Sequence, residues 1–224
     1  MSENLSQAVE DYLKVIYEIT QGGDKATTKR IAERMGVAPA SVTGMLQKLA
    51  GANPALVDYQ KHRGVALTRT GKKHALEVIR HHRLLELFLQ QKLGYSWDQV
   101  HGEADRLEHV ISEDLEERMA QALGDPAYDP HGEPIPSREF KMPDQSAVRL
   151  SELRLGDRAT VLRVQDADSA MLRYLGSIGV TPNAQINILD YSAFDGNLSL
   201  QLSGQEKPLV LGPSVTSHVF VQMQ

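Results

Sequence analysis

Histidine and carboxylate side chains recur at helical spacing near the middle of this 224-residue chain. His101, Asp105, Glu108 and His109 stand at i, i+4, i+7 and i+8, a spacing that brings all four to one face of a helix. Imidazole and carboxylate donors without sulfur are hard-to-borderline ligands that suit Mn²⁺ or Fe²⁺. The spacing therefore predicts a site for a divalent metal ion.

A second pair on the preceding predicted helix supports this interpretation. His82 and Glu86 stand at i, i+4 and face the same way. The competing interpretation is a solvated acidic helix face, which is what most charge runs are. Mixed His and carboxylate sites also serve hydrolases, but no candidate nucleophile accompanies these residues. The chain contains no cysteine, which excludes thiolate ligands, disulfides and cysteine nucleophiles.

The elements that must position these residues are two long helices, expected at about 70–93 and 104–123. Gly124 is expected to end the second helix. Residues 124–147 then hold five of the ten prolines, which predicts an extended, partly rigid linker.

The first third of the chain predicts a winged helix. Short helices over 29–35 and 39–50, separated at Gly36, form a helix-turn-helix pair, and strands over 56–59 and 65–68 form a hairpin with a basic tip. After residue 147, short strands indicate a small SH3-like β-barrel with one short helix at 169–175; the strands are expected at 159–164, 184–189, 198–202, 208–211 and 218–221. The predicted fold class is therefore α+β.

The net charge of −5 hides an uneven distribution along the chain. Residues 1–75 carry 11 Lys and Arg against 7 Asp and Glu, whereas residues 76–147 carry 7 against 15. A basic first third favours contact with DNA phosphates, and an acidic middle third favours cations. In a winged helix the second helix of the pair enters the major groove. The residues expected at DNA are Thr28, Lys29, Ala38, Pro39, Ala40, Ser41, Thr43, Gly44, Gln47, Lys48, Lys61 and Arg63.

Several segments together resemble the diphtheria-toxin-repressor family, whose members are metal-activated, homodimeric transcription regulators. These are EDYLKVIYEI, IAERMGVAPASVTGMLQKLA, YQKHRGVALTRTGKK, HHRLLELFL, VHGEADRLEHVISEDLEERM and DPHGEPIP. The resemblance implies a winged-helix DNA-binding domain at 1–75 and a helical dimerisation and metal-binding domain with its linker at 76–147. Residues 148–224 then form an SH3-like (FeoA-like) domain.

The resemblance also assigns metal ligands, and it implies two sites per subunit. The activating site falls on Asp11, Asp105, Glu108 and His109. The ancillary site falls on His82, Glu86 and His101, and the barrel should add Asp168, with Asp166 as the alternative.

Two positions depart from the patterns of the family's branches. The iron-responsive branch has Met and Cys where this chain has Asp11 and Asp105, so the oxygen ligands here resemble the manganese-responsive branch. Some members of that branch carry a carboxylate where this chain has Lys14. The lysine argues against a two-metal cluster at the activating site and favours a separate ancillary site.

The expected function is a repressor of manganese or iron homeostasis genes. It binds double-stranded operator DNA as a homodimer, with Mn²⁺, or Fe²⁺, as corepressor. The alternatives are a metal-dependent hydrolase, a winged-helix regulator that responds to an organic ligand, and a barrel that is only a peptide-binding or spacer module.

The N-terminal residues lack the features of a signal peptide, and no stretch has the ~18 apolar residues of a membrane helix. A cytoplasmic protein that is not an enzyme and has no membrane partner is therefore expected.

Overall fold

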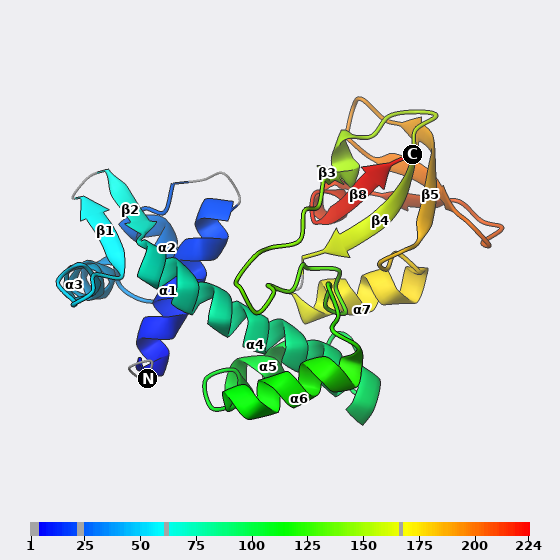
Figure 1. Ribbon diagram of the computed structural model, residues 1–224. Coiled ribbons are helices and arrows are strands. Elements are labelled where there is room, and N and C mark those ends of the chain that lie inside the picture. Colours follow the sequence, from blue (N-terminus) through cyan, green and yellow to red (C-terminus); the bar gives the residue numbers. More distant parts are fainter. Residues whose placement is uncertain (1–4, 22–24, 61–62, 166–167) are drawn as a thin grey trace. The chain divides into compact units, whose positions relative to one another are not determined.

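The computed structural model describes residues 5–21, 25–60, 63–165 and 168–224, and it divides into two compact units (Figure 1). The first unit comprises the chain up to His81 together with 108–111 and 136–141. The second comprises 82–107, 112–135 and 142–224.

The first unit contains the predicted winged helix. Helices α1 (Gln7–Gln21), α2 (Thr28–Met35) and α3 (Pro39–Ala50) precede an antiparallel hairpin of β1 (Val57–Gln60) and β2 (Gly64–Leu67). Thr27 caps α2 by accepting a hydrogen bond from the backbone N–H of Arg30 at 3.3 Å, and Gly36 ends α2 at φ +65°. The helix-turn-helix and hairpin predictions are confirmed.

Helix α1 is amphipathic, and its apolar stripe faces the core of the first unit. Val9, Leu13 and Ile16 recur at i, i+4 and i+7 and are 0–5% exposed. The stripe packs against α2 and β2, so α1 is part of the body that carries the helix-turn-helix. A change in the position of α1 would therefore also displace the helix-turn-helix.

The predicted helix over 104–123 is wrong, because two helices occupy that region. Helix α4 (Arg69–Leu93) is followed by α5 (Val100–Leu107), a turn, and then α6 (Glu113–Leu123). Ser112 accepts a hydrogen bond from the backbone N–H of Leu115 at 3.2 Å, and three acidic residues follow it in the first turn of α6. A serine cap and acidic residues both favour a helix N-terminus, so Ser112 starts a new helix.

The proline-rich segment after α6 packs more tightly than a linker would. Ile135 is 2% exposed and joins Leu84 of α4 and Ala120 of α6 in a small apolar core. Gly132 lies so close to β4 that an added Cβ would be 1.9 Å from the carbonyl oxygen of Leu162. The part of this segment that precedes residue 136 is therefore packed within the second unit and approaches its sheet at Gly132.

That sheet has six antiparallel strands in the order β3 (Val148–Arg149), β8 (Val219–Met223), β4 (Arg158–Val164), β5 (Gln185–Tyr191), β6 (Leu198–Leu202) and β7 (Leu209–Leu211). Its core receives Leu172 and Leu175 from α7 (Ser169–Ile178), and a 3₁₀ helix (Leu150–Glu152) and α8 (Pro213–Thr216) complete the domain. The α+β class and the small SH3-like domain are confirmed, although the strands described form an open sheet with edges β3 and β7 and not a closed barrel. Among the helices described, none combines the length and apolar character needed to span a membrane.

Candidate metal centres and DNA-facing surface

One candidate metal centre joins α1 to the turn after α5. We call Asp11, Glu108 and His109 the α1 group. The Nε2 atom of His109 lies 2.9 Å from Oδ1 of Asp11 and 3.2 Å from Oε1 of Glu108. His81 of α4 anchors this turn, since its Nδ1 donates to the carbonyl oxygen of Glu108 at 3.0 Å. Three predicted ligands of the activating site are thereby brought together.

Further charges of α1 surround this group. Oε2 of Glu10 accepts from Nδ1 of His109 at 2.6 Å, and Nζ of Lys14 lies 3.0 and 2.7 Å from the two carboxylate oxygens of Glu108. Burial alone would lower the pKa of the His109 imidazole, but its hydrogen bonds to Asp11, Glu10 and Glu108 raise that pKa to about 11. Without metal, His109 is therefore a cation among carboxylates.

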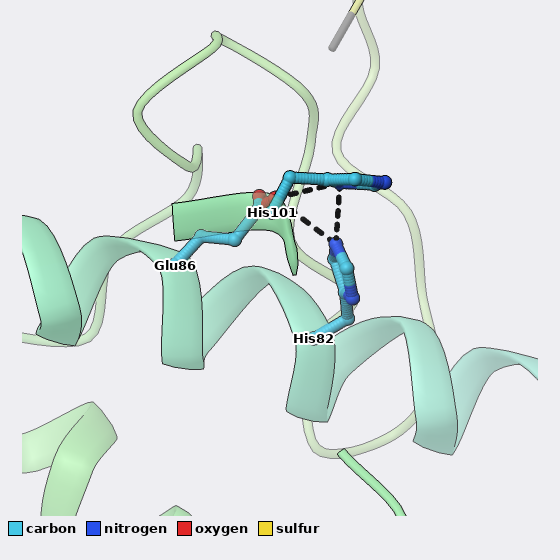
Figure 2. A group of neighbouring side chains, drawn as sticks. All are labelled: His82, Glu86 and His101. Carbon is cyan, nitrogen blue, oxygen red and sulfur yellow. Dashed lines mark hydrogen bonds and ion pairs between the residues drawn. The ribbon is translucent and has the colours of Figure 1, made fainter. Parts of the chain in front are cut away.

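The second candidate centre lies between α4 and α5 (Figure 2). We call His82, Glu86 and His101 the α4 group. Nε2 of His82, Oε1 of Glu86 and Nδ1 of His101 lie 3.0–3.1 Å from one another. Donors that each lie about 2.1 Å from one ion at right angles to each other are about 3.0 Å apart, so these three atoms fit a shared ion.

Glu86 is a buried anion at the centre of the α4 group, with 0% exposure. Burial alone would raise its pKa, but the charge of His82 and hydrogen bonds with His101, His131 and His82 lower it well below the usual value. An ionised carboxylate in such a place needs positive charge, which protonated imidazoles or a metal ion supply.

Asp105 contacts the α4 group. Its carboxylate lies 3.3 Å from Nδ1 of His82 and 3.6 Å from Nε2 of His101. The expectation that His101, Asp105, Glu108 and His109 share one helical face is wrong, because α5 ends at Leu107 and the last two residues lie in the following turn. The assignment of Asp105 to the activating site stays a prediction.

Two residues beside Glu86 were missed in the sequence. Asp129 and His131 offer ligand atoms within 4.8 Å of a Glu86 oxygen and of each other, and Nδ1 of His131 lies 3.5 Å from Oε2 of Glu86. Both are buried, with 6% and 0% exposure, and Nε2 of His131 donates to the carbonyl oxygen of Trp97 at 2.7 Å. The Asp-Pro-His run was the available signal, but the surrounding prolines favoured a linker.

Asp168 caps a helix in this structure. Its Oδ1 accepts from the backbone N–H groups of Ala170 and Met171 at 2.8 and 3.2 Å, at the start of α7. Among the residues described, Asp168 belongs to none of the groups of three or more candidate ligands. Asp166 lies outside the described residues. A metal-binding role for either carboxylate stays a prediction.

The α3 surface is open on the side predicted to face DNA. Val42, Leu46 and Leu49 are buried and hold the helix on the core, whereas residues 38–41, 44, 47 and 48 are exposed. Thr43 is half-buried, and its hydroxyl donates to the carbonyl oxygen of Pro39 at 3.1 Å. Exposed residues 29 and 63 and half-buried residue 28 flank this surface, and Lys61 lies outside the described residues. The DNA contacts themselves stay predictions.

Three family models match consecutive parts of the chain. The N-terminal DNA-binding domain of iron-dependent repressors matches residues 4–65, and the metal-binding and dimerisation domain of the same repressors matches residues 68–137. The FeoA domain matches residues 148–223. Together these matches extend over all three segments of the chain.

Curated relatives match over nearly the whole length. The iron-dependent repressor IdeR of Mycobacterium leprae is 34% identical over 216 residues, which cover 91% of this chain and 92% of that protein. The diphtheria toxin repressor of Corynebacterium diphtheriae is 28% identical, with 93% of this chain and 94% of that protein covered.

Solved structures show the same architecture. A manganese-dependent transcriptional repressor in complex with manganese matches with a TM-score of 0.90 and 40% identity, covering 96% of this chain and all of that one. The manganese regulator SloR matches with a TM-score of 0.77 and 32% identity over the full length of both chains. ScaR with bound Zn²⁺ matches with a TM-score of 0.80 and 34% identity, covering 96% of this chain and 98% of that one.

Proposed function

Since this chain belongs to the family of iron-dependent repressors that includes the diphtheria toxin repressor, we propose that Mn²⁺ is the ion that activates it. The chain is a metal-dependent transcriptional repressor of the manganese-responsive branch, with a C-terminal FeoA domain, and not an enzyme. It has a DNA-binding domain for operator DNA and a dimerisation domain that makes it a homodimer. Its place of action is the cytoplasm, where that DNA lies.

The donor atoms of the α1 group support Mn²⁺. Two carboxylates and one imidazole converge there, and a chain without cysteine offers no thiolate that would favour a softer ion. Fe²⁺ accepts the same donors, so cellular supply decides between the two ions. The similar solved structures of a manganese-dependent repressor and of the manganese regulator SloR support the same choice.

The single observation that carries the mechanism is the contact between Asp11 and His109, at 2.9 Å. Asp11 belongs to a helix that packs against α2, while His109 belongs to the turn after α5. When bound, a divalent ion would supply positive charge to both residues, and their shared interaction with it would couple the position of α1 to occupancy of the site. Asp11, Glu108 and His109 would hold the ion, and α1 would transmit the constraint to the DNA-binding helices.

The α4 group is proposed as a second site in the same subunit. His82, Glu86 and His101 would hold that ion, with Asp129 and His131 at the far side of the Glu86 carboxylate. More imidazole and fewer carboxylates make this group better suited to borderline ions than the α1 group. The regulated genes are proposed to be those of manganese or iron homeostasis.

The test is a titration of the full-length protein with Mn²⁺, Fe²⁺, Co²⁺ and Zn²⁺ while its binding to its own promoter DNA is followed by fluorescence anisotropy. We expect Mn²⁺ to strengthen binding at least ~100-fold, which corresponds to about 2.7 kcal/mol. A chelator should reverse the effect, and unrelated DNA of equal length serves as the control. Equal operator binding with and without metal would reject the proposal and favour a regulator that answers to an organic ligand.

A further inference from the structure

We propose that Lys14 sets the Mn²⁺ concentration at which the α1 group fills, because its ammonium competes with the ion for Glu108. The inference rests on the activating role proposed for Asp11, Glu108 and His109. It concerns a residue outside every ligand set assigned above. Lys14 is thus a positioning and threshold residue and not a metal ligand.

The contact is close and shielded from water. Nζ of Lys14 lies 3.0 Å from Oε1 and 2.7 Å from Oε2 of Glu108, so the lysine spans both oxygens of the carboxylate. The side chains are 13% and 2% exposed. The exposed pair of Lys29 and Glu33, at 3.8 Å with 82% and 63% exposure, shows what a solvated pair looks like here. Burial makes the Lys14 pair less screened, and hence stronger, than such surface pairs.

The oxygen shared by lysine and metal centre is Oε1 of Glu108. The same atom lies 3.2 Å from Nε2 of His109, on the side where Asp11 approaches that nitrogen at 2.9 Å. An ion bound by these three residues would draw on the lone pairs that Lys14 already occupies. It would also lie near a fixed positive charge, and like charges at short range repel.

The charges of the metal-free site agree with this role. Glu10, Asp11 and Glu108 contribute three carboxylates, and the ammonium of Lys14 lies against the most buried of them, Glu108. The carboxylates therefore do not simply repel one another when metal is absent. Lys14 offsets the negative charge of Glu108 when metal is absent, and it lowers the affinity of the site for the incoming ion.

A purely structural role makes the opposite prediction for metal affinity. If Lys14 only fixed α1 or Glu108, its loss would leave the ligands less ordered, and Mn²⁺ binding would weaken. If Lys14 competes for Glu108, its loss frees the carboxylate and Mn²⁺ binding tightens. The sign of the change in affinity separates the two roles.

The experiment measures Mn²⁺ binding to full-length Lys14→Met, which keeps the apolar stem and removes the charge. Free Mn²⁺ is read from its electron paramagnetic resonance signal, and the ion compared is the one that His109→Ala abolishes. We expect affinity for that ion to rise on the order of tenfold, as charge-assisted hydrogen bonds typically contribute. The midpoint of Mn²⁺-stimulated operator binding should move to lower concentration by the same factor.

Two further readouts support the interpretation. The melting temperature of metal-free Lys14→Met should fall, because buried Glu108 loses its counter-ion, and Mn²⁺ should raise it by more than in the wild type. Lys14→Arg keeps the charge and should retain the wild-type affinity within about threefold. Lys92→Met, on the exposed end of α4, is the matched control and should change nothing.

The outcomes separate the inference from the function it rests on. If wild-type protein binds no Mn²⁺ ion that His109→Ala removes, the proposed activating site fails. If it does, and Lys14→Met leaves that affinity unchanged or weakens it, the threshold role of Lys14 fails. Should Lys14→Met not fold, Lys14→Gln is measured in the same way and judged by the same sign.

Discussion

The α1 group and the α4 group use the same kinds of side chain but are built differently. The α4 group joins α4 to α5, and two of its three members stand one helical turn apart on α4. The α1 group joins a helix near the start of the chain to a turn near its middle. One group is thus set largely by local spacing, and the other by long-range packing.

The two groups also differ in burial and in donor type. Glu86 at the centre of the α4 group is 0% exposed and has imidazoles around it, whereas the Asp11 side chain is 37% exposed. The α1 group has more oxygen donors and lies on a helix that packs against α2. The comparison teaches that the α1 group is suited to signalling, while the α4 group is also part of a folded core.

The largest expected difference between the groups is in DNA binding. His109→Ala should weaken Mn²⁺-stimulated operator binding at least ~100-fold, because it removes the imidazole that Asp11 and Glu108 share. His101→Ala, in the α4 group, should weaken it only about tenfold. Anisotropy at saturating Mn²⁺ measures both variants, and a larger loss for His101→Ala would reverse the roles of the two groups.

The next effect concerns the stability of the metal-free protein. Here the variant in the α4 group should cause a larger loss than the variant in the α1 group. Glu86→Gln should lower the free energy of unfolding by about 2 kcal/mol, since it removes the buried negative charge that His82 and His101 share. Asp11→Asn, at a partly exposed site, should cost less than about 0.5 kcal/mol. Urea unfolding of metal-free protein measures both values. Equal losses would contradict the distinction between signalling and structural groups.

A smaller effect is the pH dependence of Mn²⁺ affinity at the α1 group. The carboxylates hold the pKa of His109 at about 11, so this imidazole is protonated at neutral pH and must release a proton when its Nε2 binds metal. As pH falls, the proton competes more strongly and Mn²⁺ affinity should drop about tenfold per pH unit. Calorimetry in buffers of different ionisation enthalpy counts the protons released. No release on filling the α1 group would contradict the structure of its metal-free state.

The smallest expected effect concerns the helix break between α5 and α6, which leaves Asp105 beside the α4 group and Glu108 and His109 in the α1 group. Ser112→Ala removes the cap that starts α6 and should lower the free energy of unfolding by about 1 kcal/mol. Ser146→Ala, at an exposed position outside any helix or strand, is the control and should stay within about 0.5 kcal/mol. Thermal and urea unfolding measure the difference. An unchanged stability for Ser112→Ala would mean that the break after α5 has another cause.

Much of the fold was predictable because its signals are local. The two short helices separated at Gly36 and the hairpin after them predicted the winged helix, and short apolar runs predicted five strands of the sheet to within about two residues. His82 and Glu86 were predictable for the same reason, since residues four apart on a helix must be neighbours.

The other site residues could not be placed from the sequence, because their positions depend on where the chain turns and on which elements pack against it afterwards. Periodicity does not show a helix break when the residues on both sides keep the same pattern, so the cap at Ser112 was passed over and four ligands were placed on one face. Asp129 and His131 lie in a segment without periodic structure, where spacing says nothing about which buried carboxylate they reach.

The sequence by itself determined most of the helices and strands, the ligand types and the absence of cysteine, because each of these is a property of a residue or of near neighbours along the backbone. Only the tertiary structure decided that Asp105 contacts His82 and that Lys14 holds Glu108. It also brought Asp11 to Glu108 and His109, which in the sequence only the family resemblance had grouped. Those contacts join residues far apart in the chain, and packing of buried apolar surface, not local backbone preference, brings such residues together.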